Sequence, residues 1–181
     1  MKQTVRIIGG KYRGKKLHFP DIANLRPTPD RVKETLFNWL MHDIRGARCL
    51  DAFAGSGALG FEAFSRGAAK VVFVETAAKA YENLQQIASS FPENNLLVVH
   101  MKAQDYLRQT TECFDLVFLD PPFIENYIPQ CMELLAHSNR LPAGGLVYLE
   151  APEKLTLDPK IWQERKSRQA GQVIYGLYEK C

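Results

Sequence analysis

The sequence lacks any apolar run near the roughly 20 residues that a membrane-spanning helix needs, and its first residues lead into no signal-peptide core. It also lacks the cysteine spacing of a metal site or a disulfide framework, since its four cysteines are scattered without a CxxC pair or nearby histidine pairs. These absences predict a cytoplasmic protein with reduced thiols, without a membrane segment and without a metal ion.

Internal repeats, low-complexity tracts and interdomain linkers are absent as well. Of the 181 residues, 46% are hydrophobic and 24% charged, which is the composition of a globular protein with a sizeable core. We therefore expect one domain over residues 1–181. Nothing in the sequence demands a dimer, so we expect a monomer.

Acidic residues are missing from positions 1–20, where six side chains are Lys or Arg. Residues 21–159 carry 12 basic and 18 acidic side chains, and residues 160–181 carry five and two, so an acidic body has basic ends. This asymmetry fits a polyanion-binding attachment on a catalytic core, although basic arms also serve solubility alone.

Residues 6–17 are typical of two short strands around the turn Gly9-Gly10. Basic side chains surround Tyr12 there, a mixture that can hold phosphates and offer a ring for base stacking. An edge hairpin protected by lysines would look similar. Because the charge is one-sided, we expect contact with RNA or DNA through Arg6, Lys11, Tyr12, Arg13, Lys15 and Lys16.

Residues 26–29, Arg-Pro-Thr-Pro, predict the start of a helix, with Thr28 as its N-cap and Pro29 in the first helical position. The apolar residues that follow recur at helical spacing and predict a buried face of Val32, Leu36, Phe37, Trp39 and Leu40. The residues expected to face solvent are Arg31, Lys33 and Glu34. Arg26, Thr28 and Arg31 lie at the helix start, where they could close over a bound ligand.

A strand, a glycine turn and the start of a helix are predicted across residues 49–60. The strand ends near the carboxylate of Asp51. Gly55 and Gly57 let the backbone approach a ligand, and Gly60 permits close helix packing.

The next strand is predicted at residues 71–74 and ends at Glu75, 20 residues beyond Gly55, where an acid can bind both hydroxyls of a ribose. These features admit either a dinucleotide or S-adenosylmethionine as the ligand. A dehydrogenase usually needs a further substrate domain, for which 181 residues leave little room.

An apolar run at residues 116–119 has the length of a buried parallel strand, and two prolines stop it after Asp120. Ligands bind at that edge of open α/β sheets. Asp120 and the Pro121 carbonyl can accept hydrogen bonds from an exocyclic amino group, while the rigid turn at Pro122 leads to Phe123, which can stack on the ring.

The alternative for this motif alone is a solvated Asp120, with Phe123 capping the core. The preceding glycine turn favours the functional interpretation. An amine clamp is of no use to a hydride donor, so S-adenosylmethionine is favoured over a dinucleotide.

The remaining elements complete an α/β pattern. Residues 96–100 predict the third strand, and residues 102–107 open a helix whose first turn can meet an adenine edge. Residues 127–137 predict a helix, and residues 146–150 a strand whose last residue, Glu150, we expect to be solvated. Residues 162–168 and 172–178 predict an antiparallel pair joined at Ala170-Gly171.

Four stretches together resemble a known family, the bacterial RsmD-type methyltransferases that modify the N2 amine of one guanine in small-subunit ribosomal RNA. They are RIIGGKYRG (6–14), RPTPDRVKETLFNWL (26–40), DAFAGSGALG (51–60) and DPPF (120–123). The glycine motif is common to many methyltransferases and Asp-Pro-Pro-Phe to several that methylate amino groups. The two amino-terminal stretches are therefore the specific signal, and the resemblance covers nearly the whole chain.

The resemblance implies a Rossmann-like class I methyltransferase fold, an α/β domain with a seven-stranded, mostly parallel sheet and one antiparallel strand. A basic hairpin in residues 1–25 would bind RNA, and residues 26–181 would form the catalytic core. The implied donor is S-adenosylmethionine, with S-adenosylhomocysteine as product and no metal. The implied partner is 16S ribosomal RNA or the assembling small subunit.

The resemblance also implies residue roles. Asp120, Pro121, Pro122 and Phe123 would hold the flipped guanine, and Arg26 and Arg31 would join the hairpin in binding RNA. Lys102 departs from the family, because relatives often place an acid or amide there, although the backbone could still serve adenine. The implied cofactor-binding residues are Thr28, Asp51, Phe53, Ala54, Gly55, Ser56, Gly57, Glu75, Thr76, Ala103, Gln104 and Asp120.

Two other functions fit parts of the pattern. An amino methyltransferase acting on DNA adenine, or on another RNA or protein amine such as glutamine, would use a similar Pro-Pro-aromatic motif. An RNA-binding assembly factor that has lost catalysis would keep the fold. The intact side chains at the ligand edge argue against that second alternative.

Overall fold

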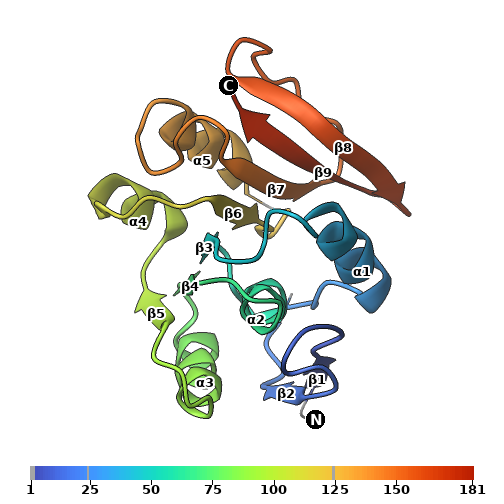
Figure 1. The fold of residues 1–181 in the computed structure, drawn as a ribbon, viewed down its shortest axis with the longest axis vertical. Helices are drawn as coiled ribbons and strands as arrows, with labels where there is room; N and C mark the ends of the chain where they lie inside the picture. Colours follow the sequence, from blue (N-terminus) through green and yellow to red (C-terminus); the bar gives the residue numbers. More distant parts are fainter. Residues whose placement is uncertain (1–2, 24, 124) are drawn as a thin grey trace.

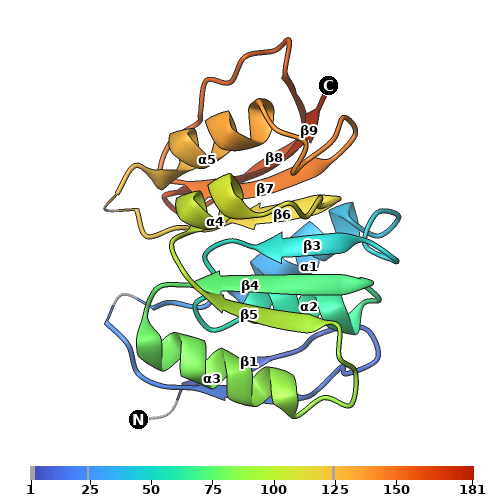
Figure 2. The same ribbon diagram turned by 90° about the vertical axis from the view of Figure 1, so that its left-hand side faces the viewer.

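A seven-stranded sheet forms the centre of the protein in a computed structural model that describes residues 3–23, 25–123 and 125–181 (Figure 1). Figure 2 shows the strand order along this sheet. The strands are β5 (Leu96–His100), β4 (Lys70–Glu75), β3 (Arg48–Asp51), β6 (Leu116–Leu119), β7 (Leu146–Ala151), β9 (Val173–Lys180) and β8 (Trp162–Ala170). Only β9 runs antiparallel to its neighbours, so the predicted sheet is confirmed.

Helices cover both faces of the sheet. α1 (Asp30–Trp39) and α2 (Ala58–Ser65) lie on one side, and α4 (Ala103–Gln109) and α5 (Tyr127–Ala136) on the other (Figure 1). α3 (Ala78–Ser89) contributes Leu84 to the core that contains α1 and α2. Each face of the sheet has its own hydrophobic core, and neighbouring strand residues point to opposite faces. Cys49 packs towards α2, and Leu50 towards α4 and α5. Burial on both faces explains why β3, β4 and β6 are continuous apolar runs.

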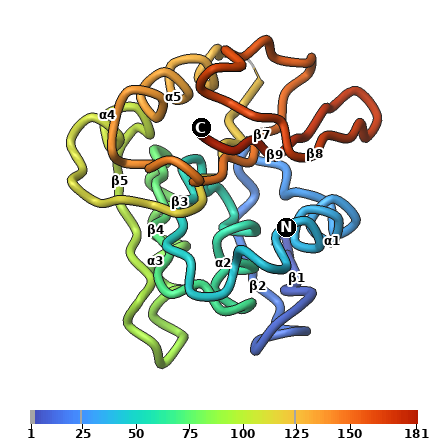
Figure 3. The backbone as a smooth tube through the Cα atoms, turned by 45° about the horizontal axis from the view of Figure 1, so that its top comes forward, coloured from blue at the N-terminus to red at the C-terminus, as the bar shows by residue number. Residues whose placement is uncertain are grey.

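The amino-terminal hairpin forms a separate two-stranded sheet of β1 (Gln3–Arg6) and β2 (Lys16–Phe19), near α1 and α2 (Figures 1 and 3). The strands lie outside the predicted Gly9-Gly10 turn, since residues 7–15 form a longer loop docked on α2. The backbone amide of Lys11 donates to the Ser65 carbonyl at 2.7 Å. Gly10 has a φ of 77°, and a Cβ there would collide with that same carbonyl. The glycine pair therefore permits close docking, not a two-residue turn.

The start of α1 differs from the prediction. Pro29, not Thr28, is the N-cap, and its carbonyl accepts hydrogen bonds from the amides of Val32 and Lys33. Thr28 is buried outside the helix, where its hydroxyl faces Asp120 instead of the first helical turn. The predicted apolar face is confirmed, except that Trp39 is half-buried and Leu40 follows the helix end.

Lys33 is fully buried, whereas the helical pattern predicts a solvent-facing side chain. Its Nζ donates to the Arg6 carbonyl at 2.7 Å and lies 3.8 Å from the equally buried carboxylate of Glu62. Glu62 also accepts hydrogen bonds from the amides of Ile8 and Gly9. The amino-terminal hairpin covers this side of α1, and the buried ammonium of Lys33 supplies a hydrogen-bond donor to its Arg6 carbonyl and a counter-charge to Glu62.

The carboxyl-terminal pair is confirmed as β8 and β9, which turn at Gly171. Tyr175 of β9 stacks on Trp39 of α1, with ring centroids 5.5 Å apart. Among the described residues, none of the helices has the length and apolar character needed to cross a membrane.

Candidate active site

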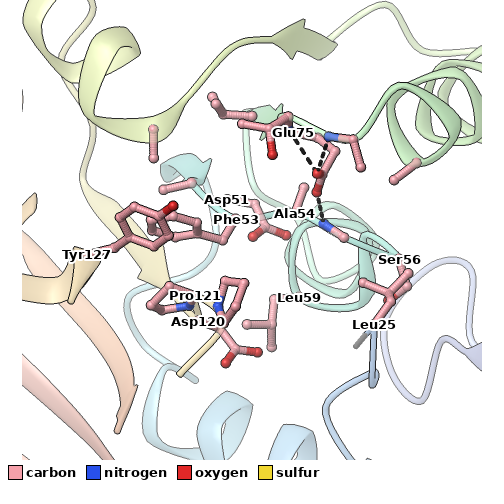
Figure 4. Close-up of a pocket in the computed structure, with 18 of the residues that line it drawn as sticks. Leu25, Asp51, Phe53, Ala54, Ser56, Leu59, Glu75, Asp120, Pro121 and Tyr127 are labelled. Carbon is pink, nitrogen blue, oxygen red and sulfur yellow. Dashed lines mark hydrogen bonds between the residues drawn. The ribbon is translucent and has the colours of Figure 1, made fainter. Parts of the chain in front are cut away.

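A cavity of about 770 Å³ lies at the carboxyl ends of β3, β4 and β6 (Figure 4). β3 and β6 are neighbours in the sheet, and their connections leave in opposite directions, β3 through α2 to β4 and β6 through α5 to β7. Such a switch point leaves a crevice outside the strand ends, where ligands bind in open α/β sheets. Residues 22, 23 and 25–29 line one side of the cavity.

The glycine turn after β3 forms one wall. Asp51, Phe53, Ala54, Gly55 and Ser56 line the cavity, whereas Gly57, also predicted to bind the cofactor, does not line it. Gly55 has a φ of 55° and would collide with Leu25 if it carried a Cβ. Gly57 instead caps the start of α2, and a Cβ at Gly60 would collide with the ring of Phe73. The glycines therefore keep the backbone open to the cavity and let α2 pack on β4.

Glu75 ties the end of β4 to this turn (Figure 4). One carboxylate oxygen accepts from the amide of Gly55 at 2.7 Å, and the other from the amides of Thr76 and Ala77, both at 2.8 Å. These three bonds hold the side chain in place, and a carboxylate has about four acceptor sites, so about one site remains for a ligand.

Asp51 is buried below the turn and accepts a hydrogen bond from the Gly60 amide at 2.9 Å. Burial raises the pKa of its carboxyl to about 7, the Gly60 amide opposes this, and the negative charge of Glu75 adds to it. The carboxyl is therefore partly protonated near neutral pH.

The first turn of α4 supplies another part of the cavity lining, with Lys102, Ala103 and Gln104. Gln104 is buried, and its amide nitrogen lies 3.4 Å from Oε1 of Gln130. Lys102 is the exposed N-cap residue of α4. His100 stacks on Tyr81 outside the cavity, with ring centroids 4.8 Å apart.

The Asp-Pro-Pro-Phe turn forms the remaining wall. Asp120 follows the last residue of β6, and Thr28 Oγ1 donates to its Oδ2 at 3.4 Å. Pro121 is buried and Pro122 exposed, and Phe123 is 48% exposed. Phe123 therefore does not cap the core, and its ring is available at the cavity.

Glu150 is buried, with 8% of its surface exposed, which corrects the prediction of a solvated strand end. β7 continues to Ala151, and β9 covers it by pairing Tyr175 with Glu150. Glu150 lines the cavity and accepts a hydrogen bond from the Tyr148 hydroxyl at 2.7 Å. The sequence places no covering strand beside this position, so its pattern alone predicts exposure.

Two other contributors carry no motif that marks them in the sequence. The ring of Tyr127 stacks on Phe53, with centroids 5.6 Å apart. Leu25 packs over Gly55. In the sequence, Tyr127 marks only the start of a predicted helix, and Leu25 lies in a predicted loop.

The predicted RNA-binding residues fall into two groups. Residues of the first group contact other side chains of the protein: Lys11 pairs with Glu93 at 2.6 Å, and the Lys15 Nζ lies 3.9 Å from the Phe91 ring centre. Tyr12 packs between Phe64 and Phe91, and its hydroxyl bonds to Glu93, so its ring is not the free stacking surface that was predicted.

The second group points away from the core. Arg26 lines the cavity with an exposed side chain, and Arg31 is exposed at the start of α1. Arg13 and Lys16 are exposed on the hairpin. None of these four forms an ion pair within the described ranges, while Arg6 lies 3.6 Å from Asp30. Within those ranges no cluster of three or more metal-ligating side chains is present either.

The glycine turn, the acid at the end of the next strand and this strand order define a class I S-adenosylmethionine-dependent methyltransferase fold. The family model described as conserved hypothetical protein 95 matches residues 5–179. The chain is 45% identical to ribosomal RNA small subunit methyltransferase D of Haemophilus influenzae, over 98% of this chain and 95% of that protein. It is 42% identical to the protein of that name from Escherichia coli, over 97% and 90%. The chain belongs to the ribosomal RNA small subunit methyltransferase D family, the RsmD type.

A solved structure agrees with this assignment. The Escherichia coli protein assigned as the methyltransferase yhhF shares 40% identity with this chain, and the two superpose with a TM-score of 0.89 over 98% of each chain. A Thermus thermophilus protein of 35% identity superposes with a TM-score of 0.80 over 97% of this chain and 99% of its own.

Proposed function

We propose that this protein transfers a methyl group from S-adenosylmethionine to the exocyclic N2 amine of a guanine in small-subunit ribosomal RNA. The observation that carries the proposal is that one cavity contains both the Gly55–Glu75 arrangement and the Asp-Pro-Pro-Phe turn. The first suits a nucleoside with free ribose hydroxyls, and the second suits a planar ring with an amino group.

The cavity fits S-adenosylmethionine in size and in charge. Its volume of about 770 Å³ lies within the range of small-molecule sites. Glu75 would accept a hydrogen bond from a ribose hydroxyl at its remaining acceptor site, and the backbone around Ala103 and Gln104 would face adenine. When bound, this cofactor supplies a methyl group on a positively charged sulfur, and the acidic lining of Asp51, Asp120 and Glu150 favours a cation there.

The Asp-Pro-Pro-Phe turn would orient the acceptor. The N2 lone pair of guanine is delocalised into the ring, so the amine must be turned before it can react. Asp120 and the Pro121 carbonyl would accept its two hydrogens, a contribution of positioning. Phe123 would stack on the extruded base, which is worth roughly 1–3 kcal/mol.

Ribosomal RNA as the acceptor is supported by the names of the relatives and by the free cations. Arg13, Lys16, Arg26 and Arg31 are exposed on the hairpin and around the cavity, where they could hold phosphates. We extend the proposal to a cytoplasmic monomer whose residues 1–25 form an RNA-binding extension of the core in residues 26–181.

Methyl transfer from labelled S-adenosylmethionine tests the proposal. Unmethylated small ribosomal subunits, naked ribosomal RNA and duplex DNA are incubated in parallel, and the products are digested to nucleosides. Label in N2-methylguanosine from RNA or subunits is expected, and Asp120→Ala should abolish it while cofactor binding persists. Label in methyladenine of DNA would overturn the acceptor. Cofactor binding without methylation of any of the three would point to a missing partner or a protein acceptor, and failure to bind the cofactor would favour a non-catalytic assembly factor.

A further inference from the structure

Asp120 and Glu150 lie side by side in the cavity. Leu119 of β6 pairs with Leu149 of β7 in parallel register, so the residues that follow end on neighbouring strands. Both carboxylates line the cavity, at the ends of these neighbouring strands. Neither forms an ion pair within the described part of the chain.

Each carboxylate is also held by a hydroxyl. Thr28 Oγ1 donates to Asp120 at 3.4 Å, and the Tyr148 hydroxyl donates to Oε1 of Glu150 at 2.7 Å. Tyr148 occupies Oε1 of Glu150 and leaves Oε2 available. Glu150 is a buried acid without a basic partner in the described part of the chain, which lowers the stability of the fold. Its place beside Asp120 therefore points to a role in the reaction.

The surrounding charges favour proton uptake by this pair. Burial raises the pKa of Asp120 well above its ordinary value, and the charges of Glu150 and Asp51 raise it further. Burial likewise raises the pKa of Glu150, although the hydroxyl of Tyr148 opposes this. The other titratable groups nearby are Glu75, which acts on Asp51, the strand neighbour Tyr175, and Arg26 on the exposed rim.

We propose that Asp120 and Glu150 act as one proton-accepting pair, in which Asp120 takes the proton that the methylated amine releases and Glu150 strengthens Asp120 as a base. This inference rests on the proposed function. Glu150 acts through Asp120 and is a positioning residue.

The chemistry of the step balances. The amine nitrogen forms a bond to the methyl carbon while the carbon–sulfur bond breaks, and the electron pair of that bond stays on sulfur, which becomes uncharged. The nitrogen is left with one proton too many, and this proton moves to a carboxylate oxygen of Asp120. Protonated Asp120 then donates its hydrogen bond to Glu150 until the proton leaves for solvent with the product.

The first test needs no substrate. Carboxyl ¹³C NMR follows the titration of Asp120 in the ligand-free wild type, in Glu150→Gln, and in Glu153→Gln, which makes the same change at an exposed residue. Glu150→Gln should lower the titration midpoint of Asp120 by about one pH unit, since it removes a neighbouring like charge. Glu153→Gln should leave the midpoint unchanged, and an equal midpoint in all three proteins would overturn the proposal.

The second test follows the rate. kcat/KM of the wild type should rise with pH as Asp120 ionises, and Glu150→Gln should move this rise to lower pH while reducing the plateau about tenfold, as expected when general-base assistance weakens. Glu150→Asp, which keeps the charge, should hold the rise near its wild-type position even if folding is weakened. An unshifted rise in Glu150→Gln would contradict the pair. Absence of methylation in the wild type, with the NMR shift intact, would instead refute the proposed function.

Discussion

At the scale of single residues, burial sets the chemistry of the strand ends. Asp51 is 2% exposed below the glycine turn, and no salt bridge to it is found among the described residues. Its raised pKa means that the folded state binds a proton which the unfolded state has already lost at neutral pH. The contribution of Asp51 to the free energy of unfolding therefore becomes less favourable to the folded state as pH rises.

We predict that Asp51→Asn changes the pH dependence of stability. The wild-type free energy of unfolding should fall relative to that of Asp51→Asn from pH 4 to pH 7, the pKa window of this carboxyl, by up to about 4 kcal/mol at 1.36 kcal/mol per pKa unit. Above pH 7 the difference should stay constant. Urea unfolding at several pH values measures it, and a difference that does not vary with pH would show that Asp51 is ionised throughout.

The exposure of Phe123 allows its role in base binding to be tested apart from any role in core packing. The residue is 48% exposed, so Phe123→Ala should change the free energy of unfolding by less than about 0.5 kcal/mol. Loss of base stacking should lower kcat/KM with ribosomal RNA by about 5- to 150-fold.

Leu97→Ala is the control, because Leu97 is 43% exposed on the edge strand β5 and outside the cavity. It should leave kcat/KM unchanged. Equal activities of both variants would remove Phe123 from the acceptor site.

At the scale of elements, one buried ion pair attaches the amino-terminal hairpin to two helices. Lys33 of α1 reaches the Arg6 carbonyl of β1, and Glu62 of α2 receives the amides of the loop that follows. Arg66 closes the network with a hydrogen bond of 2.9 Å to Glu62. The hairpin is thus fixed to the core through α1 and α2.

Lys33→Met should reduce the free energy of unfolding by about 3 kcal/mol, at the low end for breaking a buried pair, because Glu62 keeps Arg66. Amide hydrogen exchange in β1 should accelerate at the same time. Lys79→Met makes the same change at an exposed position of α3 and should be nearly neutral. Equal stability of the two variants would show that the contacts of Lys33 do not contribute to the free energy of unfolding.

At the scale of the whole molecule, the hairpin and the cavity carry charges of opposite sign. The cavity has an acidic lining, and the free cations lie on the hairpin and on the rim. A polyanion would therefore be drawn to the hairpin and the rim but not into the cavity itself. Affinity for RNA and recognition of the base are separate tasks in such an arrangement.

Arg13→Gln combined with Lys16→Gln should weaken RNA binding and reduce its salt dependence. Two lost phosphate contacts should lower the slope of log K against log salt by about 1.5. Lys79→Gln with Lys160→Gln removes two exposed lysines elsewhere at equal net charge and should retain the slope. Fluorescence anisotropy between low and physiological salt measures both, and equal slopes would move the RNA contact away from the hairpin.

Much of the fold could be predicted because its signals are local. The run before Asp120 is apolar throughout and ends at two prolines, and the turn at Gly55 needs a backbone that only glycine adopts easily. The acid at position 75 follows from the end of the next strand. These features depend on neighbours within a few residues, so the amino-acid sequence by itself determined the central strands, the glycine turn and the Asp-Pro-Pro turn.

Tertiary structure alone decided which polar side chains are buried. Lys33 is hidden because Arg6 and Glu62 come to it from other elements, Tyr12 because Phe64 and Phe91 do, and Glu150 because β9 pairs beside it. Helical or strand spacing describes one element and contains no record of the partner that covers it. Burial and pKa depend on that partner, and for these residues it lies from 25 to 79 positions away along the chain.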